Sequence, residues 1–177
     1  SEFLSKKYKI PIVSTDTEDI LRLKECDAVV IATRHDSHAK LIIKALENGK
    51  NIFVEKPLCL NLKELKLIEQ KYLEILTSSK SKPILMVGFN RRFAPLILDL
   101  KKAIKESDLP KSFIYTCNAG HIESEHWIHD PKIGGGRLIG EACHFLDLLK
   151  FLCGSSIITV EIVYEKGVNP TPDNFIL

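Results

Sequence analysis

Several features that would assign this 177-residue chain to a special class are missing from its sequence. No apolar run approaches the ~20 residues of a membrane-spanning helix, so no membrane contact is expected. Lysine and arginine number 25 against 23 aspartates and glutamates, a balance that gives no reason to expect nucleic acid as a partner. The first ten residues are charged and hold no continuous apolar core, so no signal peptide is expected.

Cysteine pairs and the common nucleotide-binding glycine pattern are also missing. The five cysteines are odd in number and none forms a Cys-x-x-Cys pair, which favours reduced thiols in a cytoplasmic protein over a disulfide framework or cysteine zinc site. Gly-x-Gly-x-x-Gly is absent, and Gly134-Gly135-Gly136 does not replace it, because no suitable strand precedes those glycines. With no repeat or low-complexity segment either, composition indicates an ordinary globular chain of one domain or two small ones.

The first half of the chain alternates short apolar runs with amphipathic segments. Uninterrupted apolar runs are typical of parallel strands covered on both faces, and three occur, at Ala28–Ala32, Ile52–Val54 and Ile84–Val87. Helical spacing predicts helices from about Ser37 to Asn48 and, capped by Asn61 with Glu64, to about Leu76. A capping box at Thr15–Glu18 predicts a short helix to about Lys24. This order predicts a doubly wound parallel α/β sheet.

Polar residues follow each of the three predicted strands, in the segments Thr33–His35, Glu55–Pro57 and Gly88–Arg92. Ligands of parallel α/β sheets bind beyond the carboxyl ends of the strands, so these residues are expected to meet at one site. Pro57 ends its strand and restricts the backbone of Lys56, which helps to aim the lysine side chain at a ligand. The alternative for Glu55-Lys56-Pro57 alone is a solvated ion pair at an ordinary strand end.

After Arg92 the pattern changes to the mixed helices and strands of an α+β domain. Apolar positions between Phe93 and Ile104 predict an amphipathic helix with Pro95 in its first turn. A second periodic helix is predicted from Leu138 to Leu152, closed by Gly154. Strands are predicted at Phe113–Cys117, at Ile157–Tyr164 and from Asn174 to Leu177.

Two polar clusters in this half suggest chemistry. Glu141, His144 and Asp147 step by three along the second helix, and a histidine beside carboxylates can act as a general acid or base. A partly buried histidine satisfied by a neighbour fits the same spacing equally well. The segment His121–His129 is rich in histidine and glutamate, but its spacing is not His-Glu-x-x-His, so a polar-ligand loop with Trp127 is favoured and no metal is expected.

Taken together these residues resemble the glucose–fructose oxidoreductase / inositol dehydrogenase (Gfo/Idh/MocA) family. The motifs that carry the resemblance over nearly the whole chain are Ala28–Thr33 followed by His38, Glu55-Lys56-Pro57, Gly134–Gly136 and His144-x-x-Asp147. A closer resemblance is to the oxidoreductase half of bi-domain proteins of bacterial surface-polysaccharide loci, which carry a zinc-dependent alcohol dehydrogenase-like half upstream. Its motifs are Gly88–Pro95, Asn118–Ile122 and Gly140–Phe145.

The resemblance implies a Rossmann-type α/β domain over residues 1–91 that binds NAD or NADP, and a partial α+β domain with an antiparallel sheet over 92–177. It also implies hydride transfer to or from a sugar, sugar nucleotide or polyol, and a homo-oligomer for the full-length protein. The implied catalytic residues are Lys56 and His144. The implied cofactor contacts are Thr33, His38, Glu55, Lys56, Pro57 and Arg91, and the implied substrate contacts are His126, Trp127, Glu141 and Asp147.

Two departures from the family pattern bear on activity. The first β-α unit with its glycine loop is not in the sequence, so we expect the chain to be a fragment without the pyrophosphate site. Gly140 stands where the family usually has an aspartate four residues before His144, and Glu141 points about 100° away on an ideal helix. An aspartate at position 140 is expected to be tolerated. The alternative function is a non-catalytic binding or assembly module that retains the fold.

Overall fold

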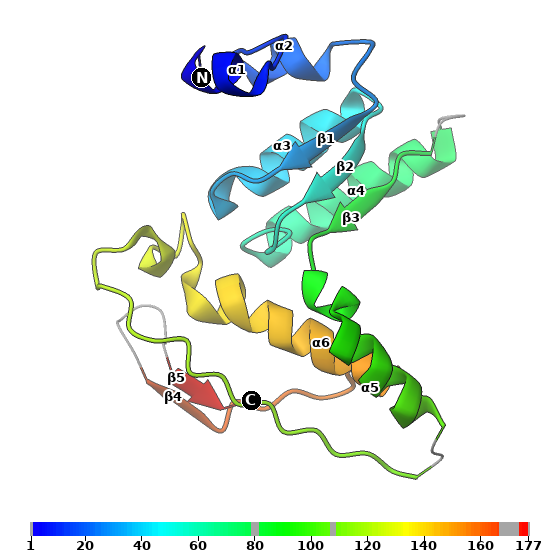
Figure 1. The fold of residues 1–177 in the computed structure, drawn as a ribbon, viewed down its shortest axis with the longest axis vertical. Coiled ribbons are helices and arrows are strands. Elements are labelled where there is room, and N and C mark those ends of the chain that lie inside the picture. Colours follow the sequence, from blue (N-terminus) through cyan, green and yellow to red (C-terminus); the bar gives the residue numbers. More distant parts are fainter. Residues whose placement is uncertain (1, 79–81, 107–108, 167–173, 177) are drawn as a thin grey trace.

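The computed structural model describes residues 2–78, 82–106, 109–166 and 174–176 (Figure 1). The helices are α1 (Glu2–Tyr8), α2 (Thr17–Leu21), α3 (His38–Glu47), α4 (Leu62–Ser78), α5 (Pro95–Lys105) and α6 (Cys143–Cys153). The strands are β1 (Ala28–Ile31), β2 (Asn51–Val54), β3 (Leu85–Val87), β4 (Tyr164–Lys166) and β5 (Asn174–Ile176). Short 3-10 turns lie at His35–Ser37, Asn90–Phe93 and Trp127–His129, and a π-helical turn spans Leu138–Ala142.

The predicted parallel sheet is confirmed, in the order β1-β2-β3. Val30 pairs with Phe53, and Phe53 pairs with Met86, both in parallel register. Figure 1 shows α3 and α4 along one face of this sheet. The core between them is apolar, with Ile42 of α3 and Val54 of β2 fully buried, which stabilises the position of each strand end.

Helix starts in the first half follow local capping chemistry. The Asn61 side chain accepts a hydrogen bond from the Glu64 backbone N–H at 3.0 Å, and the Glu64 carboxylate accepts one from the Leu60 N–H, which confirms the predicted cap of α4. The capping prediction at Thr15 is wrong by one residue. Asp16 caps α2 instead, since its carboxylate accepts from the Glu18 N–H at 2.9 Å, and α2 ends at Leu21 rather than near Lys24.

The two helices predicted in the second half are present. Helix α5 begins at Pro95 and ends at Lys105. Gly154 follows α6 with a φ of 77°, the left-handed conformation that glycine adopts without a Cβ penalty, so its predicted role as the C-cap is confirmed. The helix start differs from the prediction, because Leu138–Ala142 forms the π-helical turn ahead of α6.

The strands predicted in the second half are largely wrong. Residues 113–117 and 157–163 form no strand, and the described residues give only a short antiparallel pair, β4 with β5. Leu177 lies outside the described residues. Ile114 and Ile158 are 93% and 94% exposed, because no strand among the described residues lies beside their segments to complete hydrogen bonds and cover side chains. The described residues therefore do not build the expected antiparallel sheet domain.

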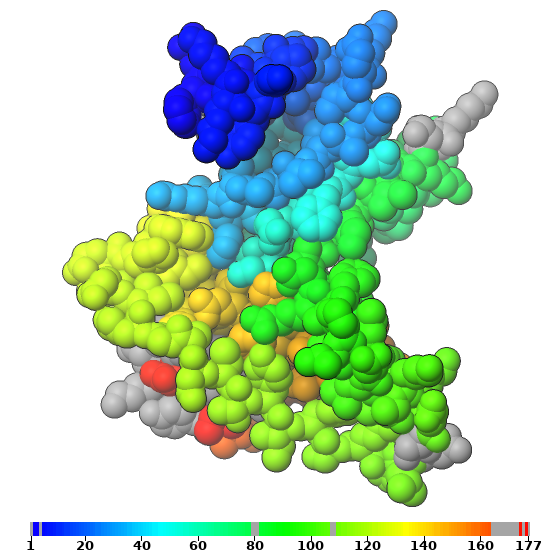
Figure 2. Space-filling model, in the orientation of Figure 1, coloured from blue at the N-terminus to red at the C-terminus, as the bar shows by residue number. Residues whose placement is uncertain are grey.

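Helix α6 lies beyond the carboxyl ends of β1, β2 and β3, beside α5 (Figure 1). The space-filling view shows the yellow segment, around residues 120–137, in contact with the blue and cyan first half (Figure 2). Helix α6 and this segment therefore approach the edge of the sheet at which the polar strand ends were predicted to meet. No helix among the described residues has both the length and the apolar character needed to cross a bilayer.

Candidate active site at the carboxyl edge of the parallel sheet

Lys56 connects the end of β2 to the π-helical turn before α6. Its ammonium Nζ donates a hydrogen bond to the backbone carbonyl of Gly140 at 2.7 Å. The Lys56–Pro57 peptide bond is cis. Lys56 and Gly140 are 84 residues apart in the sequence, so this contact fixes α6 relative to the central strand. π-Helical turns within helices are rare and frequently lie at functional sites.

Gly140 is buried in a position that leaves little room for a side chain. A Cβ at this position would lie 2.9 Å from Cδ1 of Ile128 and 3.1 Å from Cε1 of His35. The expectation that aspartate is tolerated there rested on helix propensity alone. It stays a prediction, and the structure adds that the Cδ1 end of the Ile128 side chain must move before a larger residue fits.

His144 lies in the first turn of α6 and is half-buried. Its Nδ1 is buried and has no hydrogen-bond partner among the described residues, while its ring meets Phe89 edge to face, with the ring centroids 6.1 Å apart. Burial lowers the pKa of His144, and the positive charges of Lys56 and Arg91 lower it further; Glu55 and Asp147 oppose this. The ring is therefore neutral at pH 7 and able to accept a proton.

The two carboxylates predicted beside His144 are each engaged by an arginine. Asp147 is buried, and both its oxygens accept from Arg92, with Nε at 2.6 Å from Oδ2 and Nη2 on Oδ1. Glu141 Oε2 accepts from Nε and Nη2 of Arg137 at 3.2 and 3.1 Å. The structure thus pairs Glu141 and Asp147 with buried or half-buried guanidinium groups rather than with the imidazole of His144.

His38 and Thr33 form hydrogen bonds within the loops that follow β1 and β2. His38 is fully buried, and its two ring nitrogens lie 2.7 Å from the Pro57 carbonyl and 3.0 Å from the Thr33 carbonyl. A ring held this way joins the loop after β1 to the loop after β2 and is not open to a ligand. The Thr33 side chain is exposed, and its hydroxyl forms a hydrogen bond with Ser37.

Trp127 and His35 join the segment His121–His129 to the loop after β1. The two rings meet edge to face with centroids 4.9 Å apart, and His35 Nδ1 lies 2.8 Å from the Gly134 carbonyl. Burial lowers the pKa of His35. His126 begins this 3-10 turn, where its Nδ1 accepts from the Ile128 N–H. Neither His126 nor Trp127 reaches Lys56 through a contact that the structure shows. Sequence analysis placed His35 at this edge within Thr33–His35 but did not predict its contact with Gly134, because no periodicity marks a contact across 99 residues.

Arg91 lies at the open side of the site. Its guanidinium carbon is 4.9 Å from the centroid of the Phe145 ring, and Nη1 donates to the Tyr115 hydroxyl at 3.4 Å. The Tyr115 and Phe145 rings stack with centroids 4.7 Å apart. Arg91 itself is exposed. The side chain is thus pre-positioned next to His144 by aromatic contacts while its charge remains accessible.

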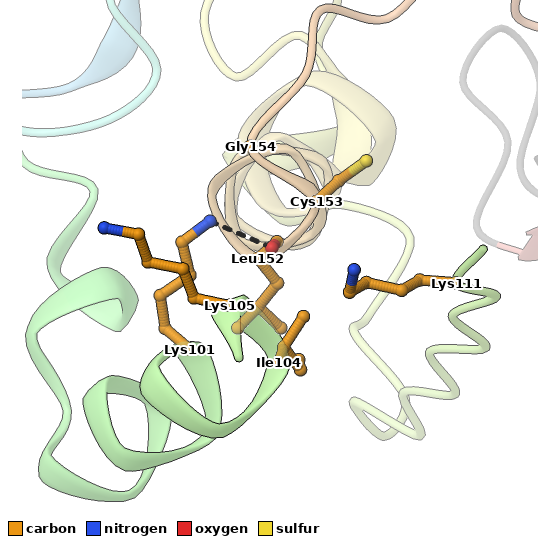
Figure 3. A pocket seen from close by; sticks show the side chains of 7 residues that line it. All are labelled: Lys101, Ile104, Lys105, Lys111, Leu152, Cys153 and Gly154. Carbon is orange, nitrogen blue, oxygen red and sulfur yellow. Dashed lines mark hydrogen bonds between the residues drawn. The ribbon is translucent and has the colours of Figure 1, made fainter. Parts of the chain in front are cut away.

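A separate hollow lies at the far end of α6, bordered by Lys101, Lys105, Leu152 and Gly154 (Figure 3). Lys101 Nζ donates to the Phe151 and Leu152 carbonyls at 2.6 and 3.0 Å, so its ammonium caps the helix C-terminus. Nine residues along a helix separate Cys153 from His144, roughly 14 Å. This hollow therefore does not belong to the Lys56 site. Over the described ranges, no three histidine, cysteine, aspartate or glutamate side chains gather as metal ligands would.

Comparison with known proteins places the first half of this geometry in a family. Residues 1–79 match the model of the GFO_IDH_MocA oxidoreductase family, described as an NAD-binding Rossmann fold. This match spans residues 1–79, less than half of the chain, and shows the Rossmann part of the family there. The predicted family and its Rossmann-type parallel sheet are therefore confirmed for the segment that contains Lys56, β1 and β2.

Curated relatives extend the similarity into the second half. The scyllo-inositol 2-dehydrogenase (NAD(+)) of Bacillus subtilis is 36% identical over 163 residues, which is 90% of this chain and 45% of the relative. The inositol 2-dehydrogenase of Rhizobium meliloti is 34% identical over 153 residues, 84% of this chain and 44% of the relative. The chain thus spans slightly less than half the length of these curated relatives.

Solved structures support the same Gfo/Idh/MocA fold. Levoglucosan dehydrogenase in complex with NADH and levoglucosan aligns with a TM-score of 0.69 at 25% identity, over 85% of this chain and 41% of that structure. An oxidoreductase domain protein from Kribbella flavida gives a TM-score of 0.69 at 25% identity, over 86% of this chain and 42% of that structure. Because residues 1–79 are less than half of the chain, alignments over 85% and 86% of it also include part of the second half.

Proposed function

We propose that the protein is an NAD(P)-dependent oxidoreductase that transfers hydride to or from a hydroxyl-bearing carbon of a sugar, sugar nucleotide or polyol. The single observation that supports this most is that Lys56, at the end of β2, bonds to the turn ahead of α6 and carries a charge that lowers the pKa of His144 in that helix. One offers a charged donor and the other a buried, unpartnered ring nitrogen among the described residues. Such a pair suits the oxygen of a carbinol, which loses a proton as its carbon loses hydride.

The residues of the strand ends fit the nicotinamide side of such a cofactor better than its phosphates. Gly88 lies where a Cβ would sit 3.2 Å from Oε2 of Glu55 and from Cζ of Phe53, so the backbone after β3 is packed closely against these side chains. No Gly-x-Gly-x-x-Gly phosphate loop exists in the sequence. When bound, a nicotinamide supplies the hydride acceptor or donor; Thr33, Glu55 and Pro57 would line its ring.

The remaining chemistry falls to Lys56 and His144. The Lys56 ammonium would donate a hydrogen bond to the substrate oxygen and stabilise the negative charge that develops there as the proton leaves. His144 would take that proton, since its lowered pKa keeps the ring neutral at pH 7. In the reverse direction the same groups return the proton to the oxygen. His38 and the Arg92–Asp147 pair hold these two side chains in place without touching substrate.

Relatives guide the choice of test substrates. Two curated relatives are named for scyllo-inositol or inositol, and one related structure contains levoglucosan. We expect the protein, in its longest native form, to reduce NAD⁺ or NADP⁺ with at least one member of a panel of inositols, levoglucosan, simple sugars, sugar acids and sugar nucleotides, read as absorbance at 340 nm. A cofactor that binds while every panel member fails would support the non-catalytic module instead.

The finer resemblance remains part of this proposal. An upstream zinc-dependent alcohol dehydrogenase-like half and a place in surface-polysaccharide synthesis would favour sugar nucleotides over inositols as substrates. The competing binding module is favoured by one feature, the glycine at position 140, which offers Lys56 its backbone carbonyl but no side-chain carboxylate. The panel separates these readings, because activity confined to sugar nucleotides, activity on inositols and no activity are three different results.

A further inference from the structure

Some of the charged side chains around His144 form ion pairs, and others do not. The buried carboxylate of Asp147 is paired with Arg92, and that of Glu141 with Arg137, so these four charges cancel locally. Among the described residues, neither Lys56 nor Arg91 lies within ion-pair distance of a carboxylate. The Lys56 ammonium contacts a neutral carbonyl, and the Arg91 guanidinium contacts a ring and a phenol hydroxyl.

Glu55 is the carboxylate that remains to oppose them. It follows β2 directly and is half-buried, with Oε2 near the backbone of Gly88. Two unpaired cations against one unpaired anion leave a net positive charge beside His144. The influence of Lys56 and Arg91 on the imidazole exceeds that of Glu55 and Asp147, which agrees with this charge balance.

Arg91 has the geometry for an anionic group on a ligand. Phe145 and Tyr115 hold the guanidinium from one side, and the side chain is otherwise exposed next to the site. A guanidinium presents a rigid set of N–H donors that matches carboxylate or phosphate oxygens. Lys56, half-buried at the end of β2, adds a second positive charge on the side of the reacting oxygen.

Resting on the proposed oxidoreductase function, we propose that the substrate carries an anionic group, a carboxylate or a phosphate, which Arg91 binds while Lys56 and His144 act on the reacting hydroxyl. A sugar acid or a phosphorylated sugar would then be turned over in preference to its neutral counterpart. The competing occupant of Arg91 is a phosphate of the cofactor. That alternative predicts weaker cofactor binding, not altered substrate choice, when Arg91 loses its charge.

The test compares matched substrates on the protein in its longest native form: glucuronate with glucose, and glucose 6-phosphate with glucose. We expect kcat/KM to favour at least one anionic substrate by about tenfold or more at low salt, since each charge-assisted contact is worth roughly that factor, and to lose much of the preference at 0.5 M NaCl. The glucuronate and glucose 6-phosphate arms separate carboxylate from phosphate recognition.

Arg91→Gln is the matched variant, because glutamine retains N–H donors without the charge. It should lower kcat/KM for the anionic substrate by about tenfold while the neutral sugar and the dissociation constant of NADH change less than threefold. Equal losses on anionic and neutral substrates, or a loss confined to NADH binding, would overturn the proposal. A wild-type preference for the neutral sugar would overturn it too.

A second pair of variants places charge at Gly140. Gly140→Asp adds a carboxylate beside Lys56 and should reduce the anionic preference, whereas Gly140→Ala adds the same crowding against Ile128 and His35 without charge and should retain it. An equal change in the preference for the anionic substrate in both variants would count against the proposal.

Failure of the oxidoreductase function is recognised separately. If the chemical shifts of His144 change on adding glucuronate but not glucose, and no substrate is turned over, the anion-binding proposal is supported and the proposed oxidoreductase function is refuted. If only neutral sugars are turned over, the oxidoreductase function is supported and the anion-binding proposal is refuted.

Discussion

Replacing Lys56 with methionine is expected to lower kcat by about 10²–10⁴-fold, the usual contribution of a positioned acid or base. Methionine keeps the length and apolar stem of the side chain but removes the charge that faces the substrate oxygen. It also removes the hydrogen bond to Gly140. Because the proposed hydride chemistry needs that oxygen polarised, turnover should fall while NAD(P)H affinity stays within a few-fold.

Steady-state turnover of the best substrate in the panel measures this effect. Lys63→Met is the control, since Lys63 is an exposed lysine of α4 and should leave turnover unchanged. His144→Ala should cost less than Lys56→Met if charge stabilisation by Lys56 contributes more than proton transfer by His144, and as much if the two act as a unit. Wild-type turnover in both Lys56→Met and His144→Ala would show that the site is misassigned.

The second large effect concerns the ion pair that holds α6 to the loop after β3. Asp147 has a side-chain exposure of 7%, and Arg92 one of 36%. Arg92→Met leaves a buried carboxylate without its partner, and removing one member of such a pair costs several kcal/mol when both are buried. Because Arg92 is partly exposed and water can replace some of its contacts, we expect a loss of about 2–3 kcal/mol in the free energy of unfolding.

Urea denaturation of three variants tests this expectation. Arg92→Met and Asp147→Leu each change one partner, and the double variant replaces the pair with apolar side chains of similar size. The double variant should recover most of the stability that Arg92→Met loses, because no unpaired charge remains buried. Additive losses in the double variant would mean that the pair does not act through its mutual contact.

The sequence predicted the first half well because its signals are local or periodic. Apolar runs indicated β1, β2 and β3, and their parallel order followed from the crossover rule once α3 and α4 were recognised. The expected cover on both faces is wrong for β1 and β3, since Val30 is 72% exposed and Met86 42% exposed. The placement of Lys56 at a strand end came from the position of Pro57 in the sequence. These inferences needed no knowledge of which distant segments touch.

The second half was predicted less well for a physical reason. The β-branched residues of 113–117 and 157–163 favour extended chain, but a strand also needs a neighbour to pair with, and periodicity does not reveal one. The partners of Glu141 and Asp147 were missed likewise. Their three-residue spacing suggested a shared face with His144. Asp147 instead pairs with Arg92, 55 residues away, through tertiary packing, whereas Glu141 pairs with Arg137 four residues earlier, a local pair that the sequence could have indicated.

The crowding at Gly140 illustrates the same limit. The helix propensities of glycine and aspartate are similar, so propensity alone predicts a small effect of exchanging them. Propensity does not include the packing of Ile128 and His35 against this position. The contact that positions Lys56 is made to the backbone carbonyl of Gly140, and a motif of side chains cannot predict a contact to a backbone group.

The central claim, that Lys56 and His144 form one site, is tested most directly by the pKa of His144. Nuclear magnetic resonance of the histidine rings, with His144→Gln to assign the signal, would follow the titration in the wild-type chain and in Lys56→Met. The Lys56 ammonium disfavours the protonated imidazole, so its removal should raise the pKa of His144 towards the ordinary value of 6.5. Lys63→Met should leave it unchanged. A His144 pKa that is the same with and without the Lys56 charge would contradict a shared site.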